Sequence, residues 1–171
     1  LYNLIAGLIG SDRIFALEDP SYEKIRKVYK NANVKYELLA LGNDGIESKA
    51  LNKTKAQVLH ISPFRSFPTG ISASASKRYE YIRWADSSDR IIVEDDFESE
   101  FSVLGKPVET LFSMATKDNV IYLNTFSKTI SPALRVGYMV LPEHLIDTFN
   151  KKLGFYSCTV PTFEQLVLTE L

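Results

Sequence analysis

Apolar positions recur along the chain in two patterns, which alternate from one segment to the next. Short runs of consecutive apolar, often β-branched residues predict buried strands, whereas apolar residues three and four positions apart predict amphipathic helices. Strands are expected at residues 13–17, 34–41, 56–61, 90–95, 120–124 and 135–141. Helices are expected at residues 1–10, 20–32, 75–85, 107–115, 143–153 and 162–171, and a turn-rich segment with one helical turn at residues 42–54.

This alternation of strands and helices predicts an α/β fold. Strands joined by helical crossovers form a mostly parallel sheet that is covered on both faces, which gives three αβα layers. The 171 residues suffice for about one domain. In such a sheet, ligands bind beyond the carboxyl ends of the strands, so the loops that follow strands are expected to carry the binding site.

The composition narrows the class of protein. The chain is 45% hydrophobic and 24% charged, and its formal net charge of −1 gives no electrostatic footprint for nucleic acid. A DNA contact would therefore need another part of the protein. A single cysteine, Cys158, excludes an intrachain disulfide and favours a reducing compartment. The apolar stretch at residues 4–9 is too short to span a bilayer, so we expect a cytoplasmic protein.

Three of the loops after predicted strands carry side chains suited to chemistry. Tyr22 follows the strand at residues 13–17, and a run of carboxylates begins at the end of the strand at residues 90–95. The segment "TFSKT" follows the strand at residues 120–124 and contains a lysine, with an arginine further along the chain.

These side chains together match the needs of one cofactor. Hydroxyls beside an arginine bind phosphate, and a lysine there is either a second phosphate contact or a nucleophilic amine. A carboxylate can pair with a protonated ring nitrogen, and pyridoxal phosphate needs all of these groups. Each feature alone also fits a solvated loop, a charged surface or a packed aromatic residue. No G-x-x-x-x-G precedes Lys128, which excludes a P-loop.

The histidines do not indicate a metal site. His60 lies within an apolar run and is interpreted as a core histidine, and His144 as a residue in the first turn of a surface helix. Two histidines and one cysteine far apart in the chain make a metal centre improbable.

The motifs "EDPSY", "FPTG", "VEDDFESEF" and "NTFSKTISPALRVGYMVLP", in this order, closely resemble the aminotransferase-like domain of MocR/GabR-type transcriptional regulators of the GntR family. These proteins fuse a winged-helix DNA-binding domain to a fold-type-I aminotransferase domain. The resemblance covers nearly the whole chain. It implies that residues 1–171 are a partial domain, the core of the large domain that binds pyridoxal phosphate. The winged-helix domain and the C-terminal small domain would lie outside this chain, and the full-length protein would be a homodimer.

The resemblance also implies roles for residues of the "TFSKT" motif. Lys128 would form the internal aldimine with pyridoxal phosphate, which makes it the catalytic residue. Arg135, with Thr125 and Ser127, would hold the phosphate.

Further roles follow for the ring of the cofactor. Asp95 would pair with the pyridine nitrogen, with Asp96 as the alternative if the register is shifted by one residue. Tyr22 would stack on the ring, and Phe67 lies beneath it, where many aminotransferases have asparagine.

The chain departs from the family pattern at several positions. Phe97 stands where a tyrosine usually donates a hydrogen bond to the phenolic oxygen of the cofactor. Arg65 and Ser66 replace a histidine and a glutamine, and Lys24 stands where some members have a substrate-binding arginine. Lys24 and Arg65 are therefore the candidate contacts for a substrate or effector.

The sequence leaves three functions open. The first is an effector-sensing domain of a regulator, in which an amine or amino acid reacts with the bound cofactor. The second is a working aminotransferase that moves an amino group from an amino acid to a 2-oxo acid. The third is an inert structural fragment. The missing hydroxyl at Phe97 favours sensing over catalysis.

Overall fold

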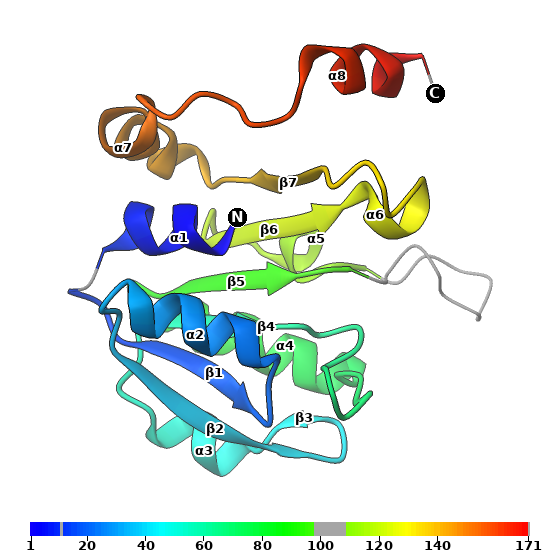
Figure 1. Ribbon diagram of the computed structural model, residues 1–171. Coiled ribbons are helices and arrows are strands. Elements are labelled where there is room, and N and C mark those ends of the chain that lie inside the picture. The colour runs from blue at the N-terminus through cyan, green and yellow to red at the C-terminus, as the bar shows by residue number, and fades with distance from the viewer. Residues whose placement is uncertain (11, 98–108, 171) are drawn as a thin grey trace.

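The computed structural model describes residues 1–10, 12–97 and 109–170. Their centre is a seven-stranded sheet in the order β3-β2-β1-β4-β5-β6-β7, with helices on both faces (Figure 1). The strands are β1 (Phe15–Asp19), β2 (Tyr36–Gly42), β3 (Gly45–Ile46), β4 (Val58–Ile61), β5 (Ile91–Asp95), β6 (Val120–Thr125) and β7 (Gly137–Val140). This architecture confirms the predicted α/β class.

The middle of the sheet is parallel and its two edges are antiparallel. Strands β2, β1, β4, β5 and β6 pair in parallel, with Phe15 opposite Tyr36 and Val58. The short strand β3 pairs antiparallel with β2, and β7 pairs antiparallel with β6. The prediction of a largely parallel sheet is confirmed, and both antiparallel pairings lie at the edges.

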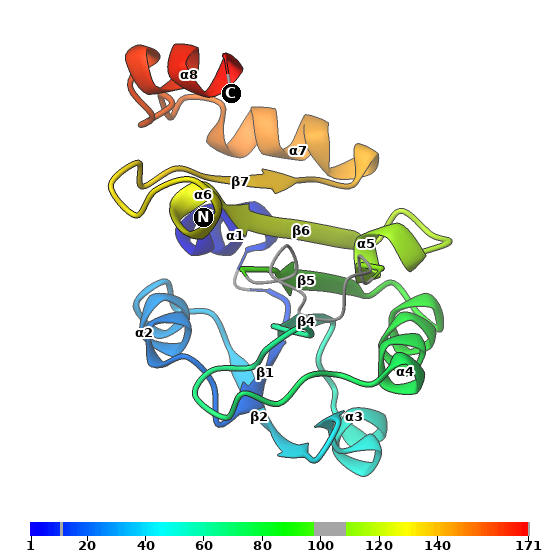
Figure 2. The same ribbon diagram turned by 90° about the vertical axis from the view of Figure 1, so that its right-hand side faces the viewer.

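Helices form the two outer layers (Figure 2). Helices α1 (Tyr2–Ile9) and α2 (Glu23–Asn31) cover one face, and α7 (Glu143–Leu153) packs against α1. The other face carries α3 (Ser48–Lys53), α4 (Ala75–Asp86) and α5 (Leu111–Met114); α6 (Phe126–Thr129) directly follows β6, and α8 (Thr162–Thr169) is the last helix. None of the helices in the described part of the chain is long and apolar enough to cross a membrane.

The apolar runs of the sequence supply two cores, one on each face of the sheet. Successive strand residues point to opposite faces. Phe15 and Leu17 accordingly join the core beneath α1 and α2, while Ala16 between them joins the core beneath α4. Val93 and Ile92 divide in the same way on β5. Burial on both faces explains why these strands read as continuous apolar runs rather than as alternating ones.

The structure corrects several element boundaries. Strand β1 ends at Asp19 rather than at residue 17, because its pairing with β2 continues to the match of Asp19 with Ala40. Helix α2 begins at Glu23, so Pro20 belongs to the preceding turn rather than to the first helical position. Strand β3 was not predicted, since two residues carry no periodicity. The predicted helix at residues 107–115 is observed only as α5, and its first two positions lie outside the described residues.

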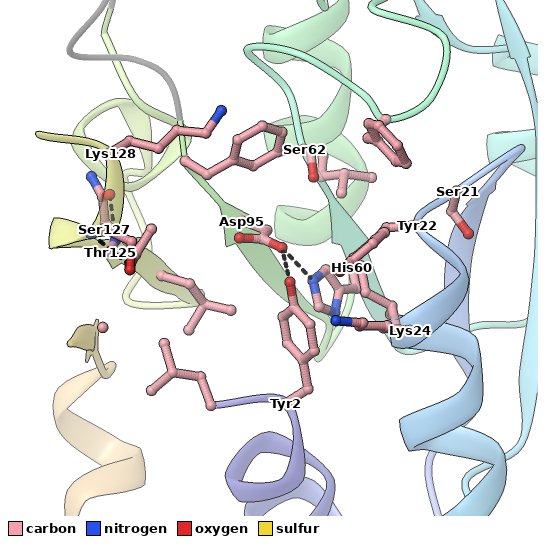
Figure 3. A pocket seen from close by; sticks show the side chains of 18 of the residues that line it. Tyr2, Ser21, Tyr22, Lys24, His60, Ser62, Asp95, Thr125, Ser127 and Lys128 are labelled. Atoms are coloured by element: carbon pink, nitrogen blue, oxygen red, sulfur yellow. Dashed lines mark hydrogen bonds and ion pairs between the residues drawn. The ribbon is translucent and has the colours of Figure 1, made fainter. Parts of the chain in front are cut away.

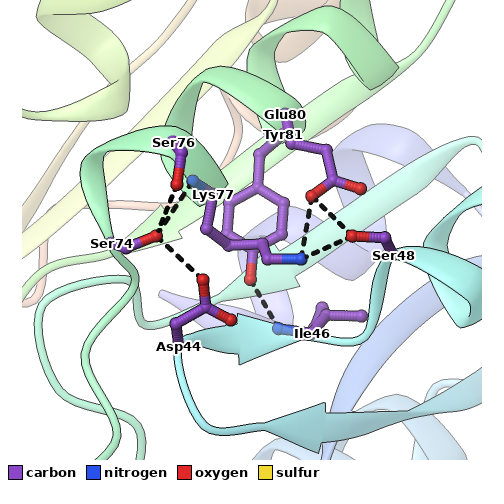
Figure 4. Close-up of polar contacts among 8 residues, drawn as sticks. All are labelled: Asp44, Ile46, Ser48, Ser74, Ser76, Lys77, Glu80 and Tyr81. Atoms are coloured by element: carbon purple, nitrogen blue, oxygen red, sulfur yellow. Dashed lines mark hydrogen bonds and ion pairs between the residues drawn. The ribbon is translucent and has the colours of Figure 1, made fainter.

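Helix α4 fastens the β2–β3 hairpin through polar contacts (Figure 4). The Ile46 backbone N–H donates to the Tyr81 hydroxyl at 2.7 Å. The Lys77 ammonium donates to Ser48 Oγ at 2.9 Å and pairs with the Glu80 carboxylate at 2.8 Å. Tyr81 and Lys77 are 1% and 6% exposed, and the bond between Ile46 and Tyr81 is buried, which strengthens the attachment of the hairpin to α4.

Gly45 at the start of β3 should not tolerate a side chain. Its φ is +127°, and a Cβ there would clash with the Tyr81 hydroxyl and the Lys77 side chain, because both would lie closer to it than van der Waals contact allows. Gly45→Ala is expected to lower the free energy of unfolding by about 2–4 kcal/mol, from backbone strain and overpacking together. Urea unfolding measures this loss.

Gly70→Ala is the matched control, because Gly70 also has a positive φ (+75°) but nothing within 4 Å of a Cβ. Its loss should be about 1 kcal/mol, the cost of the backbone conformation alone. Equal losses for the two variants would contradict the tight packing of the hairpin against α4.

Candidate functional site

A cavity of about 780 Å³ opens at the carboxyl ends of the central strands. Residues from the ends of β1, β4, β5 and β6 line it, together with the starts of α1 and α2 and the segment from α6 to β7. This is the edge at which open α/β sheets bind ligands, and the volume is within the range of small-molecule sites.

The structure gathers most of the residues that the sequence singled out. Those that line the cavity are Tyr22, Lys24, Phe67, Asp95, Phe97, Thr125, Ser127, Lys128 and Arg135. Arg65 is exposed and does not line it, whereas its neighbour Ser66 is buried. The prediction that Arg65 contacts an effector therefore has no support from its position.

One side of the cavity is cationic and rich in hydroxyls. Thr125 ends β6 and caps α6 by accepting a hydrogen bond from the Ser127 backbone N–H at 3.2 Å, and the two hydroxyls are 3.1 Å apart. Lys128 lies one residue further on α6. Arg135 precedes β7 with φ +52°, in the left-handed region. Two cations and two hydroxyls can together bind a dianion such as a phosphate group.

Phe97 lies next to the lysine. The Lys128 ammonium is 4.7 Å from the centroid of the Phe97 ring, a cation–π distance. The aromatic face therefore offers Lys128 an electrostatic contact but no hydroxyl.

The opposite side of the cavity is aromatic. Tyr22 immediately precedes α2, and its ring meets Phe67 edge-on, with centroids 5.6 Å apart and planes at 89°. The Lys24 ammonium lies 5.8 Å from the centroid of the Tyr22 ring. Figure 3 shows this wall across the cavity from Thr125, Ser127 and Lys128. A flat ligand can lie between the two walls.

Asp95 stands between these walls at the end of β5, and its side chain is 13% exposed. The Tyr2 hydroxyl donates to Asp95 Oδ2 at 2.5 Å, and His60 Nε2 is 3.7 Å from the same oxygen. Asp96, the alternative partner for a ring nitrogen, does not line the cavity. It is fully buried and accepts a hydrogen bond from the Tyr122 hydroxyl at 2.7 Å. Of the two aspartates, Asp95 is thus the one that lines the cavity.

Sequence reasoning gave no role in the cavity to His60, Glu18 or Tyr2, which also line it. His60 is buried and bonded to Tyr29, as expected of a core histidine, but it also lines the cavity. Glu18 lies near the end of β1, so the rule about carboxyl strand ends could have found it. Tyr2 lies on a helix that is far from Asp95 in the sequence, and no sequence signal marked it.

Glu18 is a buried acid in the wall of the cavity. Burial raises the pKa of Glu18 to about 7, although the Ser66 hydroxyl, which donates to its carboxylate at 2.8 Å, opposes this rise. Burial therefore favours the protonated form of Glu18 over the form that an exposed glutamate takes at neutral pH. In the described part of the chain, no group of three histidine, cysteine or acidic side chains could hold a metal ion.

Glu18 should make stability depend on pH. Because its pKa is about 7 in the folded protein and 4.5 in the usual reference state, the folded state keeps a proton that the unfolded state loses between these values. The stabilisation is complete below pH 4.5 and is lost as the pH rises to 7. In Glu18→Gln this side chain no longer titrates, so the loss of stability does not occur. Urea unfolding should show the free energy of unfolding of the variant rising relative to that of the wild type between pH 4.5 and pH 7, by on the order of 3 kcal/mol.

The control is Glu47→Gln, at an exposed position outside the cavity. Its pH profile should follow that of the wild type. If Glu18→Gln also runs parallel to the wild type, Glu18 does not titrate with a raised pKa.

Comparisons with known proteins show the family of this chain. HTH-type transcriptional regulator YdeL of Bacillus subtilis (strain 168) is 30% identical over 153 residues, which are 90% of this chain and 33% of that protein. The probable rhizopine catabolism regulatory protein MocR of Rhizobium meliloti is 28% identical over 84% of this chain and 29% of its own length. The chain thus spans about a third of the length of these curated relatives.

A solved structure with the same fold is LysN, an α-aminoadipate aminotransferase of Thermus thermophilus complexed with N-(5'-phosphopyridoxyl)-L-leucine. Its TM-score is 0.84 at 26% identity, over 99% of this chain and 46% of that chain. The family model for aminotransferases of class I and II matches residues 2–170. This chain therefore belongs to the class I and II aminotransferase family, with curated relatives among MocR-type transcriptional regulators.

Proposed function

We propose that this chain is the pyridoxal-phosphate-binding, effector-sensing part of a GntR-family transcriptional regulator. The observation that carries the proposal is the meeting of Lys128, Asp95 and Arg135 in one cavity at the carboxyl ends of the sheet. The similarity to HTH-type regulators over most of the chain supports the regulatory half of the proposal.

The cavity fits pyridoxal phosphate in its donor set. The side that holds Arg135, Thr125 and Ser127 suits a phosphate, and Asp95 suits a protonated ring nitrogen. The Tyr22 ring suits a stacked aromatic partner. When bound, this cofactor supplies an aldehyde that reacts with amines and a ring that withdraws electrons.

Each residue then has a distinct task. Lys128 would supply the amine that holds the cofactor, and Phe67, in edge-on contact with Tyr22, would help to hold its ring. Phe97 fills the place of a tyrosine without its hydroxyl. Lys24, exposed at the start of α2, offers a cation for a carboxylate on the effector. A point charge binds a carboxylate less specifically than an arginine fork.

Other parts of the regulator supply what this chain lacks. We infer a winged-helix domain that contacts DNA, a C-terminal small domain and a homodimer in the full-length protein, which would work in the cytoplasm. Reaction of an amine or amino acid with the bound cofactor would then favour one conformation of the dimer over another, and through it alter DNA binding.

An aminotransferase is the second candidate, because LysN, whose solved structure has the same fold, is an α-aminoadipate aminotransferase. An inert fragment is the third. Phe97 favours sensing, since catalysis profits from a hydroxyl that the ring lacks. Steady release of a 2-oxo acid by the full-length protein would favour the enzyme.

Lys128→Ala should abolish covalent attachment of the cofactor. The full-length protein is mixed with pyridoxal phosphate, reduced with borohydride and digested, and the labelled peptide is identified by mass. We expect the label on Lys128 in the wild type and none in the variant, because alanine has no amine. Lys24→Ala, which changes another lysine of the cavity, should keep the label. Label on a different lysine of the wild type would contradict the assignment.

Phe97→Tyr should change the titration of the bound cofactor. A tyrosine hydroxyl at this place can donate to the phenolic oxygen and so favour the deprotonated form of the lysine-bound cofactor. We expect the pKa read from its visible spectrum to fall by about one unit. Phe112→Tyr, outside the cavity, should leave it unchanged. An unaltered pKa in Phe97→Tyr would place Phe97 away from that oxygen.

A further inference from the structure

We propose that Tyr2 and His60 are positioning residues that hold one oxygen of Asp95, so that the other oxygen faces the ring nitrogen of the cofactor. This inference rests on the proposed function. It concerns Asp95 Oδ2, the carboxylate oxygen that faces two aromatic side chains of the cavity wall, Tyr2 from α1 and His60 from β4 (Figure 3).

Tyr2 is a permanent hydrogen-bond donor. Its hydroxyl lies 2.5 Å from Asp95 Oδ2, and burial, followed by the nearby Asp95 charge, raises the pKa of Tyr2 well above its usual value. The phenol therefore keeps its proton at any physiological pH and directs it at Oδ2. Hydrogen bonds from a neutral donor to a carboxylate are short and strong, as this distance indicates.

The proton on His60 is fixed by Tyr29. The Tyr29 hydroxyl is 2.6 Å from His60 Nδ1, and burial, followed by Asp95, raises the pKa of Tyr29 well above its usual value. Among the described residues this hydroxyl has no other acceptor, so Tyr29 donates to Nδ1. The ring proton then sits on Nε2, because a neutral imidazole carries one proton.

That proton faces the same carboxylate oxygen. His60 Nε2 is fully buried without a hydrogen-bond partner within the described chain, and Asp95 Oδ2 lies 3.7 Å away. The rings of Tyr2 and His60 also pack edge to face, with centroids 5.3 Å apart. The packed His60 ring thus helps to hold the Tyr2 ring in place beside Asp95.

Tyr2 donates to Oδ2, and the His60 Nε2–H group faces the same oxygen from 3.7 Å, beyond hydrogen-bond distance, which leaves Oδ1 for the cavity. Oδ1 has no hydrogen-bond partner among the described residues and points away from both rings (Figure 3). Turning the carboxylate would break the Tyr2 bond, so Oδ1 is held ready for a donor in the cavity. Binding a ring N–H then costs little reorganisation, which is the advantage of a preorganised site.

The test compares two probes in the full-length protein. One is pyridoxal phosphate, and the other is its 1-deaza analogue, in which a carbon replaces the ring nitrogen. Tyr2→Phe removes one oxygen atom and keeps the ring. We expect it to weaken pyridoxal phosphate about 3- to 10-fold, the effect of one lost hydrogen bond, and the analogue less than about 2-fold. Fluorescence titration measures both dissociation constants.

Tyr81→Phe is the matched control, because it removes a buried tyrosine hydroxyl on the opposite face of the sheet. It should not discriminate between the probes. Tyr29→Phe is the second variant. It removes the hydroxyl that donates to His60 Nδ1, so the proton of the His60 ring is no longer fixed on Nε2. We expect a smaller loss of affinity than in Tyr2→Phe, again for pyridoxal phosphate and not for the analogue. This second variant keeps the inference testable if Tyr2→Phe does not fold.

The outcomes separate the inference from the function on which it rests. A loss confined to pyridoxal phosphate supports the positioning role. An equal loss for both probes means that Tyr2 only shapes the cavity, and no loss for either means that Asp95 needs no support; both overturn the inference while cofactor binding stands. If the wild type binds neither probe, the proposed function fails and the inference falls with it.

Discussion

The parallel pairing of the five central strands is the constraint on which the rest of the structure depends. Parallel neighbours must be joined by crossovers, and these crossovers supply the helices that bury both faces. The same pairing brings every carboxyl strand end to one edge. Residues as distant in sequence as Glu18, Asp95 and Thr125 are therefore neighbours around a single cavity.

The acidic run at the end of β5 shows how strand geometry assigns separate tasks to adjacent residues. Glu94 is buried on the α5 side, where it accepts the backbone N–H groups of Leu111 at 2.8 Å and Phe112 at 2.9 Å. Asp95 points to the opposite face and reaches the cavity, and Asp96 is buried against Tyr122. An acidic run of this kind usually forms a solvated charged surface, but residues 94–96 do not. Glu94 binds backbone N–H groups of α5, Asp95 lines the cavity, and Asp96 is buried.

The cavity combines two properties that suit a sensor. Its charged groups would suit the proposed cofactor, with a phosphate at one end and a basic ring nitrogen at the other, and Asp95 accepts a hydrogen bond from Tyr2. At the same time Phe97 provides a cation–π face for Lys128 rather than a hydroxyl. Tight binding with weakened chemistry would allow an amine to exchange on the cofactor without rapid turnover. The separation of binding from catalysis is what a regulator derived from an enzyme requires.

The sequence by itself determined the α/β class, the order of the principal strands and helices, and the groups of the cavity that lie in loops after strands. It could do so because hydrophobic periodicity is a local property and because parallel strands share one functional edge. The two-residue strand β3, the end of β1 at Asp19 and the start of α2 at Glu23 escaped it, since pairing with distant segments sets those limits. Only the tertiary structure placed Asp95 rather than Asp96 in the cavity wall, brought Tyr2 and His60 to Asp95 and left Arg65 outside the cavity. The direction of a side chain depends on strand register and on the packing of helices from elsewhere in the chain, and neither is written in a local pattern.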